Sequence, residues 1–264
     1  IGNGVLLSFQ DVLKDKWVRL KNYDRLLSDK IFLKAVWNSV KYMIGTCALL
    51  IPFPLLFASL LNSKLMKKPG FFKSIYFLPA LTSVVVAGTI FRLIFGEMDT
   101  ALANRVIEFF GHSPIKWLKG QWTGYFALLL VACWRWTGVN ILYFLAGLQS
   151  ISTDLYEAAS IDGASKWQQF KKISFPLVKP TTVYVLTISI YAGLSMFLES
   201  YMLWKGNNSP QNIGLTIVGY LYRQGIEKRA MGYACAVGLV LLIVVMIVNL
   251  IQLTVTGTFK KEER

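Results

Sequence analysis

The chain has 264 residues, 55% of them hydrophobic, and a mean hydropathy of +0.49 that is too high for an ordinary soluble domain. Its formal net charge of +14 would indicate a nucleic-acid-binding surface on a soluble protein. Many of its Lys and Arg residues instead lie in short connections between apolar segments of about 20 residues, the length that spans a bilayer. The composition therefore predicts a membrane protein that binds no nucleic acid.

Residues 1–38 form a distinct N-terminal region. Residues 1–9 are a short apolar stretch typical of the end of a membrane span, so we expect a further helix upstream of Ile1. Residues 11–34 mix charges with apolar side chains that recur at three and four residues in the later part. This spacing predicts an amphipathic helix on the external surface of the membrane.

Residues 39–264 contain five apolar segments long enough to cross a membrane. These predicted spans occupy residues 40–61, 74–95, 124–148, 180–203 and 230–255. Pro52 and Pro54 predict a kink in the first span, which a neighbouring helix must stabilise by pairing the freed carbonyl groups. The predicted fold is an all-α polytopic helical bundle with five spans in this chain and a sixth upstream.

Two basic segments, together with the polar residues 149–179, set the predicted orientation. Residues 62–73 contain four lysines and no acidic residue, and the tail 259–264 is also basic at Lys260 and Lys261. The positive-inside bias assigns both to the cytoplasm, together with residues 149–179. The N-terminal region, which this orientation places outside, is basic as well. The orientation therefore depends on the agreement between the charge bias and the sequence motif of residues 149–179 described below.

Residue types that carry covalent chemistry are scarce. Cys47, Cys133 and Cys235 lie inside apolar segments without metal or disulfide spacing, and the single His112 falls in a predicted loop. The sequence has no Gly-x-x-x-x-Gly-Lys-Ser/Thr phosphate loop. We therefore expect no catalytic residue, metal or cofactor in this chain, and any ATP must be bound by another chain.

Residues 149–179 hold the most specific pattern. Glu157-Ala158-Ala159 is followed after three residues by Gly163, then after nine residues by Ile173, one residue and Phe175-Pro176. This spacing is that of the cytoplasmic coupling motif of binding-protein-dependent ABC importers, with Phe175 in place of the usual Leu. The alternative is a cytoplasmic loop that folds onto its own bundle.

Local signals in this segment predict two short helices joined by a sharp turn. Asp154 and Ser165 each have Glu or Gln three residues later, which is the spacing of a capping box. Gly163 is placed to end the first helix in the left-handed conformation. The predicted helices occupy residues 155–162 and 166–173, the second ending at Pro176.

The chain resembles the permease subunits of type I ABC importers, and most closely the sugar-uptake branch that contains maltose-type and glycerol-phosphate-type permeases. Further matching blocks are Lys21-Asn22-Tyr23, residues 75–80 (IYFLPA) and residues 143–151 (YFLAGLQSI), so the resemblance covers nearly the whole chain. It implies a permease subunit in the bacterial cytoplasmic membrane that imports a sugar or oligosaccharide.

The resemblance also implies an assembly with a second permease, two ATP-binding subunits that hold ATP and magnesium, and an extracytoplasmic solute-binding protein. The residues implied to couple the permease to an ATP-binding subunit are Glu157, Ala158, Ala159, Asp162, Gly163, Ile173 and Pro176. Closure of the ATP-binding subunits would rock the helices between inward and outward access. The alternatives are the same machinery for glycerol phosphate or another polar solute, or a secondary transporter that needs no ATP.

Polar and aromatic residues within two spans are candidates for a substrate path: Arg135, Asn140, Tyr143, Phe197, Glu199 and Tyr201. Intramembrane charges usually face a cavity or a partner, and aromatic rings stack on sugars. Ordinary pairing and packing explain the same residues, and Asn140 fits a hydrogen bond to another helix. At 1.5 Å per residue, the depths of Arg135 and Glu199 differ by roughly 9 Å, which disfavours a direct ion pair. The family resemblance also allows the substrate site to lie in the partner permease.

Overall fold

The structure is a computed structural model that describes residues 2–12, 16–63, 66 and 68–257. The predicted upstream end at Ile1, the lysines at 64 and 67, and the tail 259–264 lie outside these residues. The chain divides into two compact units, which are described separately. Unit 1 comprises Ile1–Gly45, Ser83–Val131 and Ile190–Gln252; unit 2 comprises Thr46–Thr82, Ala132–Ser189 and Leu253–Arg264.

The described residues are mostly helical with almost no strands, and the predicted all-α membrane bundle is confirmed. Three helical segments are long and apolar enough to cross a membrane by themselves: Lys30–Leu61, Gln121–Gln149 and Met231–Val255. Two bent helix pairs bring the number of spans to five if each pair is counted as one span: Pro69–Leu81 with Val84–Ile94, and Lys166–Leu177 with Lys179–Leu194. The sequence correctly located five apolar segments and the interruption of the first, where one helix ends at Leu50 and the next begins at Pro52. It did not predict the breaks in the second and fourth segments.

Unit 1 contains the N-terminal elements and much of the polar connections. Its elements are α1 (Gly2–Ser8), β1 (Gln10–Asp11), β2 (Lys16–Trp17), α2 (Lys21–Ser28), most of α3 (Lys30–Leu50), α6 (Val84–Ile94), α7 (Leu102–Phe109), the start of α8 (Gln121–Gln149), α13 (Leu198–Leu203), η2 (Pro210–Asn212), α14 (Ile217–Tyr222), η3 (Arg223–Glu227) and most of α15 (Met231–Val255). β1 and β2 are antiparallel. Leu26, Phe32, Ile217, Tyr220 and Val237 are buried together in one core cluster.

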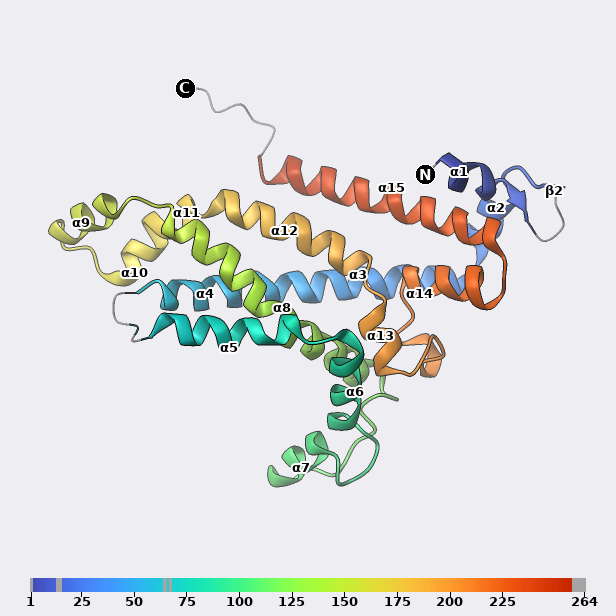
Figure 1. Cartoon of the computed structure of the whole chain (residues 1–264), viewed down its shortest axis with the longest axis horizontal. Helices are drawn as coiled ribbons and strands as arrows, with labels where there is room; N and C mark the ends of the chain where they lie inside the picture. The colour runs from blue at the N-terminus through green and yellow to red at the C-terminus, as the bar shows by residue number, and fades with distance from the viewer. Residues whose placement is uncertain (1, 13–15, 64–65, 67, 258–264) are drawn as a thin grey trace. The chain divides into compact units, whose positions relative to one another are not determined.

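Unit 2 contains the remainder of α3 and α8, α4 (Pro52–Leu61), α5 (Pro69–Leu81) and the motif segment. The motif segment consists of α9 (Thr153–Ile161), α10 (Lys166–Gln169), η1 (Phe170–Ser174) and α11 (Phe175–Leu177), and it leads into α12 (Lys179–Leu194). Figure 1 shows α4 and α5 side by side, and α9 with α10 as a hairpin beyond the end of α8. The core packs Leu55, Ile141, Phe144, Val178 and Val185 together.

The short amphipathic helix expected in the later part of residues 11–34 is α2, but the first membrane-crossing helix begins earlier than predicted. Only α2 is a separate helix, and α3 begins at Lys30 rather than near residue 40. The side chain of Asp29 explains this start, because its Oδ1 atom accepts the backbone N–H groups of Ile31 at 2.8 Å and Phe32 at 3.2 Å. Asp29 therefore caps α3 at a point that hydropathy does not mark.

Two predicted continuous spans are broken. In the second span, α5 ends at Leu81 and α6 begins at Val84. In the fourth span, α12 ends at Leu194 and α13 begins at Leu198. The break in the fourth span has no proline nearby. The carbonyl of Met196 instead accepts a 2.7 Å hydrogen bond from the buried hydroxyl of Thr216, so a tertiary contact takes the place of the helical ladder.

Candidate functional site

The motif segment is an exposed hairpin whose first helix begins earlier than predicted. The N-cap of α9 is Ser152, whose Oγ accepts the N–H of Asp154 at 3.3 Å. The predicted cap at Asp154 is therefore wrong. Asp154 lies in the first turn, where its negative charge favours the positive end of the helix dipole.

The turn at Gly163 has the predicted left-handed conformation, with a φ of 76°. The N–H of Gly163 donates to the carbonyl of Ser160 at 3.1 Å, and that of Ala164 donates to Ala159 at 2.9 Å. This pair of bonds is a Schellman motif. A Cβ atom at position 163 would meet nothing within 4 Å, so it is the backbone conformation, and not lack of space, that favours glycine there.

The second helix begins with the predicted capping box. The N–H of Ser165 donates to Oε1 of Gln168 at 2.7 Å, and the N–H of Gln168 donates to Oγ of Ser165 at 3.3 Å. The predicted end at Pro176 is wrong, because the helix widens into the π-helical turn η1 and continues to Leu177. The wider turn relieves the clash between a proline ring and the carbonyl four residues earlier.

Two side-chain contacts that the sequence pattern did not reveal hold the hairpin together. The buried Gln169 donates through Nε2 to the hydroxyl of Ser160 at 2.8 Å and to the carbonyl of Ala164 at 3.3 Å. The hydroxyl groups of Tyr156 and Ser174 lie 2.9 Å apart. No sequence signal marks these contacts, because each joins residues on different helical segments.

A hollow lies between the arms of this hairpin, with a volume of about 350 Å³. It is lined by Ala159, Asp162, Gly163, Ala164, Gln168, Gln169, Lys172 and Ile173. The structure thus brings together four of the seven predicted coupling residues. Glu157, Ala158 and Pro176 are exposed outside the hollow.

Two large apolar side chains of the hairpin face solvent. Ile161 is 87% exposed and Trp167 is 66% exposed, both next to the turn. Together with the hollow they form a surface that places exposed apolar side chains beside polar groups. The sequence pattern placed Ile161 on the first helix of the motif but did not single out Trp167.

The predicted substrate-path residues of unit 2 have local partners. The guanidinium of Arg135 lies over the ring of Trp136, 5.2 Å from its centroid. Asn140 is buried and donates to the carbonyl of Leu50 at 2.8 Å, which confirms the expected bond to another helix. Tyr143 makes an edge contact with Tyr184, with ring centroids 5.4 Å apart.

The predicted residues of unit 1 gather around one tyrosine that the sequence pattern missed. The ring centroids of Phe197 and Tyr201 lie 5.2 Å and 5.7 Å from that of Tyr222, and 5.1 Å from each other. Glu199 is partly buried in the first turn of α13. This cluster provides a small aromatic surface of the kind that can stack on a sugar ring.

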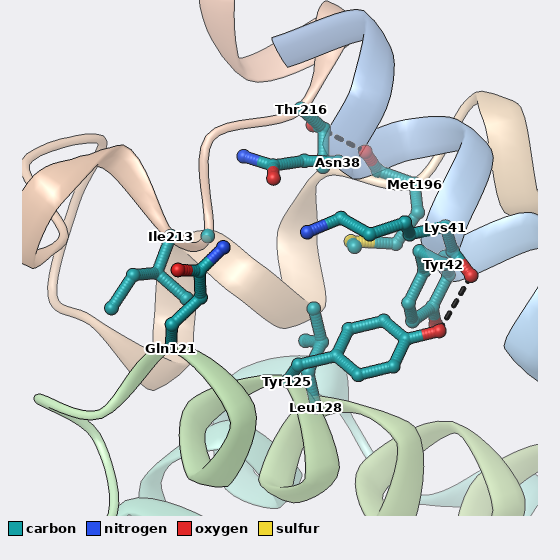
Figure 2. A pocket seen from close by; sticks show the side chains of 10 residues that line it. Asn38, Lys41, Tyr42, Gln121, Tyr125, Leu128, Met196, Ile213 and Thr216 are labelled. Carbon is teal, nitrogen blue, oxygen red and sulfur yellow. Dashed lines mark hydrogen bonds between the residues drawn. The ribbon is translucent and has the colours of Figure 1, made fainter. Parts of the chain in front are cut away.

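A second hollow in unit 1 is too small for a sugar. Figure 2 shows Lys41, Gln121 and Tyr125 around it, with the hydroxyl of Tyr125 donating to the backbone carbonyl of Lys41. Its volume of about 10 Å³ is enough for about one water molecule. Across the described ranges, no group of three or more His, Cys, Asp or Glu residues is arranged to hold a metal ion.

The described chain is thus a helical membrane bundle with an exposed helix–turn–helix, in which each of the two helices starts at a serine N-cap. The chain belongs to the family of binding-protein-dependent transport system inner membrane components, which it matches over residues 50–257. It is therefore a multi-pass protein of the inner membrane, as the resemblance implied.

Individual relatives cover most of the chain. It is 54% identical to the arabinooligosaccharides transport system permease protein AraP of Bacillus subtilis (strain 168), over 97% of this chain and 82% of the relative. It is 30% identical to the lactose transport system permease protein LacF of Rhizobium radiobacter, over 95% and 82%. The fold matches a crystal structure of a bacterial ABC transporter involved in the import of the acidic polysaccharide alginate, with a TM-score of 0.87, 22% identity and coverage of 98% of this chain and 90% of that chain.

Proposed function

We propose that this chain is one permease subunit of an ATP-driven sugar importer, and that its cargo is an oligosaccharide of arabinose. Two relatives support a sugar as the class of cargo, since their names specify arabinooligosaccharides and lactose. The 54% identity to the former over 97% of this chain favours the arabinose oligomer. Glycerol phosphate is the main competing cargo.

The observation that carries the coupling part of the proposal is the α9–α10 hairpin. Its turn is fixed by the Schellman motif at Gly163 and its second helix by the capping box at Ser165. In the proposed assembly this hairpin docks on an ATP-binding subunit, which holds the ATP and magnesium. Ala158 and Ala159 allow close approach of the partner, Glu157 and Asp162 offer carboxylates, and the remaining surface comes from Gly163, Ile173 and Pro176.

The cargo contacts are proposed on two groups of residues. Arg135, Asn140 and Tyr143 form one group and Phe197, Glu199 and Tyr201 the other. The aromatic cluster of Phe197, Tyr201 and Tyr222 is the stronger candidate, since three rings within 6 Å of one another offer apolar faces to a sugar. The buried amide of Asn140 already has a structural partner in Leu50.

The test is the ATPase activity of the complete transporter in nanodiscs, with its binding protein and partner subunits. An arabinose oligosaccharide delivered by the binding protein should stimulate hydrolysis, and glycerol phosphate should not. Stimulation by glycerol phosphate alone would overturn the proposed cargo while leaving the coupling proposal intact.

The coupling proposal is tested with two substitutions at one position. Gly163→Val places a β-branched residue at φ 76°, which costs about 1–3 kcal/mol and disfavours the turn. Gly163→Asn keeps the turn, because asparagine tolerates the left-handed region. We expect stimulated hydrolysis to be lost with Val and largely retained with Asn. Equal activity of both variants would contradict docking through this turn.

A further inference from the structure

The short helix α7 exposes a concentrated apolar face on unit 1. Leu102, Val106, Phe109 and Phe110 recur at the spacing of one helix face and are exposed by 61%, 49%, 85% and 71%. The rings of Phe109 and Phe110 meet edge to face at 5.5 Å. Such a concentration of exposed apolar area on α7 and its C-cap residue Phe110 calls for a partner.

Hydrogen bonds fix the rotation of α7 about its own axis, so the exposure of its apolar face is a property of the fold. Asn104 lies on the opposite face and is fully buried. Its Oδ1 accepts the backbone N–H of Ile115 at 3.1 Å and the indole N–H of Trp117 at 2.9 Å, and its Nδ2 donates to the carbonyl of Met98 at 3.1 Å. Three hydrogen bonds therefore hold the polar side of the helix inward and the apolar face outward.

The flanks of α7 carry the polar residues of an interfacial helix. Arg105 and Glu108 are exposed and lie together on one side, between the buried face and the apolar face. A bilayer boundary satisfies this arrangement, because the apolar face can enter the acyl region while the charged flank stays in water. A protein partner that buried the apolar face would also have to cover the charged side chains of Arg105 and Glu108.

The helices before and after α7 in the chain also expose apolar side chains. The preceding helix α6 exposes Val86, Ile90 and Leu93, and the following helix α8 exposes Trp122, which is 74% exposed, and Phe126. Tryptophan at the end of a span marks the membrane–water interface.

The residue types favour lipid over a second protein. Contacts between helices in a membrane are enriched in small residues that permit close approach. The outward face of α7 contains only Leu, Val and Phe. Bulky flexible side chains without small neighbours are suited to a fluid partner.

We propose that α7 is a membrane-anchoring helix, whose face of Leu102, Val106, Phe109 and Phe110 lies in the boundary between the headgroups and acyl chains of the bilayer. The helix would fix the connection between α6 and α8 at the membrane surface. This role does not depend on the cargo or on the coupling hairpin.

Site-directed spin labelling tests the proposal on the complete transporter in phosphatidylcholine nanodiscs. In a background without Cys47, Cys133 and Cys235, single cysteines replace Val106 or Phe109 on the apolar face, or Arg105 or Glu108 on the charged flank. Collision rates are measured with oxygen, which concentrates in lipid, and with a water-soluble nickel chelate. The two flank positions are matched controls on the same helix.

We expect the ratio of oxygen to nickel collisions to be several-fold higher at 106 and 109 than at 105 and 108. Nickel access at all four positions would show that the face is in water and would overturn the proposal. Exclusion of both reagents from 106 and 109 would show a protein partner and would also overturn it.

A second measurement covers the case in which a cysteine variant fails to assemble. A photoreactive benzoylphenylalanine replaces Phe109 and preserves an aromatic side chain at that position. Irradiation should produce adducts with phospholipid. An adduct with a partner subunit or the binding protein in place of lipid would refute the proposal.

Discussion

Asn140 shows how one side chain can make a proline acceptable inside a membrane helix. The carbonyl of Leu50 would normally accept the N–H of residue 54, but Pro54 has none. The amide of Asn140 on α8 donates to that carbonyl at 2.8 Å. The sequence predicted that a neighbour must satisfy the freed group, and the structure identifies it.

Replacement of Asn140 by Leu should destabilise the protein by about 1–3 kcal/mol, because the carbonyl of Leu50 is left without a partner. A fall in the thermal midpoint of the nanodisc-bound protein measures the loss. The double variant Asn140→Leu/Pro54→Ala is the control, since an alanine in place of Pro54 restores a backbone N–H for that carbonyl. Absence of any rescue in the double variant would show that the amide matters for another reason.

Asp29 makes a pH-dependent contribution to folding in unit 1. Burial tends to raise its pKa, but hydrogen bonds from the hydroxyl of Tyr220 and the N–H groups of Ile31 and Phe32 outweigh this and lower the pKa below its usual 3.8. Burial and the bond to Asp29 raise the pKa of Tyr220. The carboxylate therefore favours the folded state in its ionised form.

Because the pKa of Asp29 is lowered on folding, its stabilising effect is fully present above pH 3.8 and disappears as the pH falls through the folded pKa. We expect the thermal midpoint of the unmodified protein to decline across this acidic range. Asp29→Asn keeps a competent helix cap but should show a shallower decline. Parallel pH profiles for the two proteins would contradict this assignment.

At the level of elements, the capping box at Ser165 sets the start of α10. Ser165→Ala should weaken the hairpin by about 1 kcal/mol, because the N–H of Gln168 loses its acceptor. Ser165→Thr retains the hydroxyl and should behave like the original protein. Hydrogen exchange of the amides in residues 166–169 measures the difference, and equal exchange in both variants would show that the cap contributes little.

The hairpin was predictable because its determinants are local. Gly163, Ser165 and Gln168 lie within five residues of one another, so their spacing alone encodes the bonds that form. The same applies to the five apolar segments, whose length and hydropathy are direct sequence properties. The hydrogen bond from Gln169 to Ser160 could not be predicted, since the two residues lie on different helices.

The break in the fourth span and the early start of α3 were not predicted, because a hydrogen bond sets each of them and hydropathy does not. α12 ends where the carbonyl of Met196 binds Thr216, twenty residues away, and α3 begins where Asp29 caps it. Hydropathy windows average over both features. Likewise, the π-helical turn η1 lets the helix continue past Pro176, where the sequence predicted its end.

At the scale of the whole molecule, the proposed assembly predicts what should co-purify with the complete protein in mild detergent. A second permease and an ATP-binding subunit should be retained, and Gly163→Val, which disfavours the turn, should release the ATP-binding subunit. Gly111→Val is the matched control, because Gly111 also has a left-handed φ of 80° with open space around it. Release by both variants would point to general misfolding, and retention by both would refute docking at the hairpin.

The π-helical turn η1 has a consequence for insertions and deletions. In this turn the N–H of Phe175 reaches back five residues to the carbonyl of Phe170, so the segment holds one residue more than a regular α-helix would need. Removing one residue between 170 and 174 would restore the regular ladder and rotate everything before it by about 100° around the helix axis. The chain length of this segment therefore determines the direction in which the α9–α10 hairpin presents its hollow.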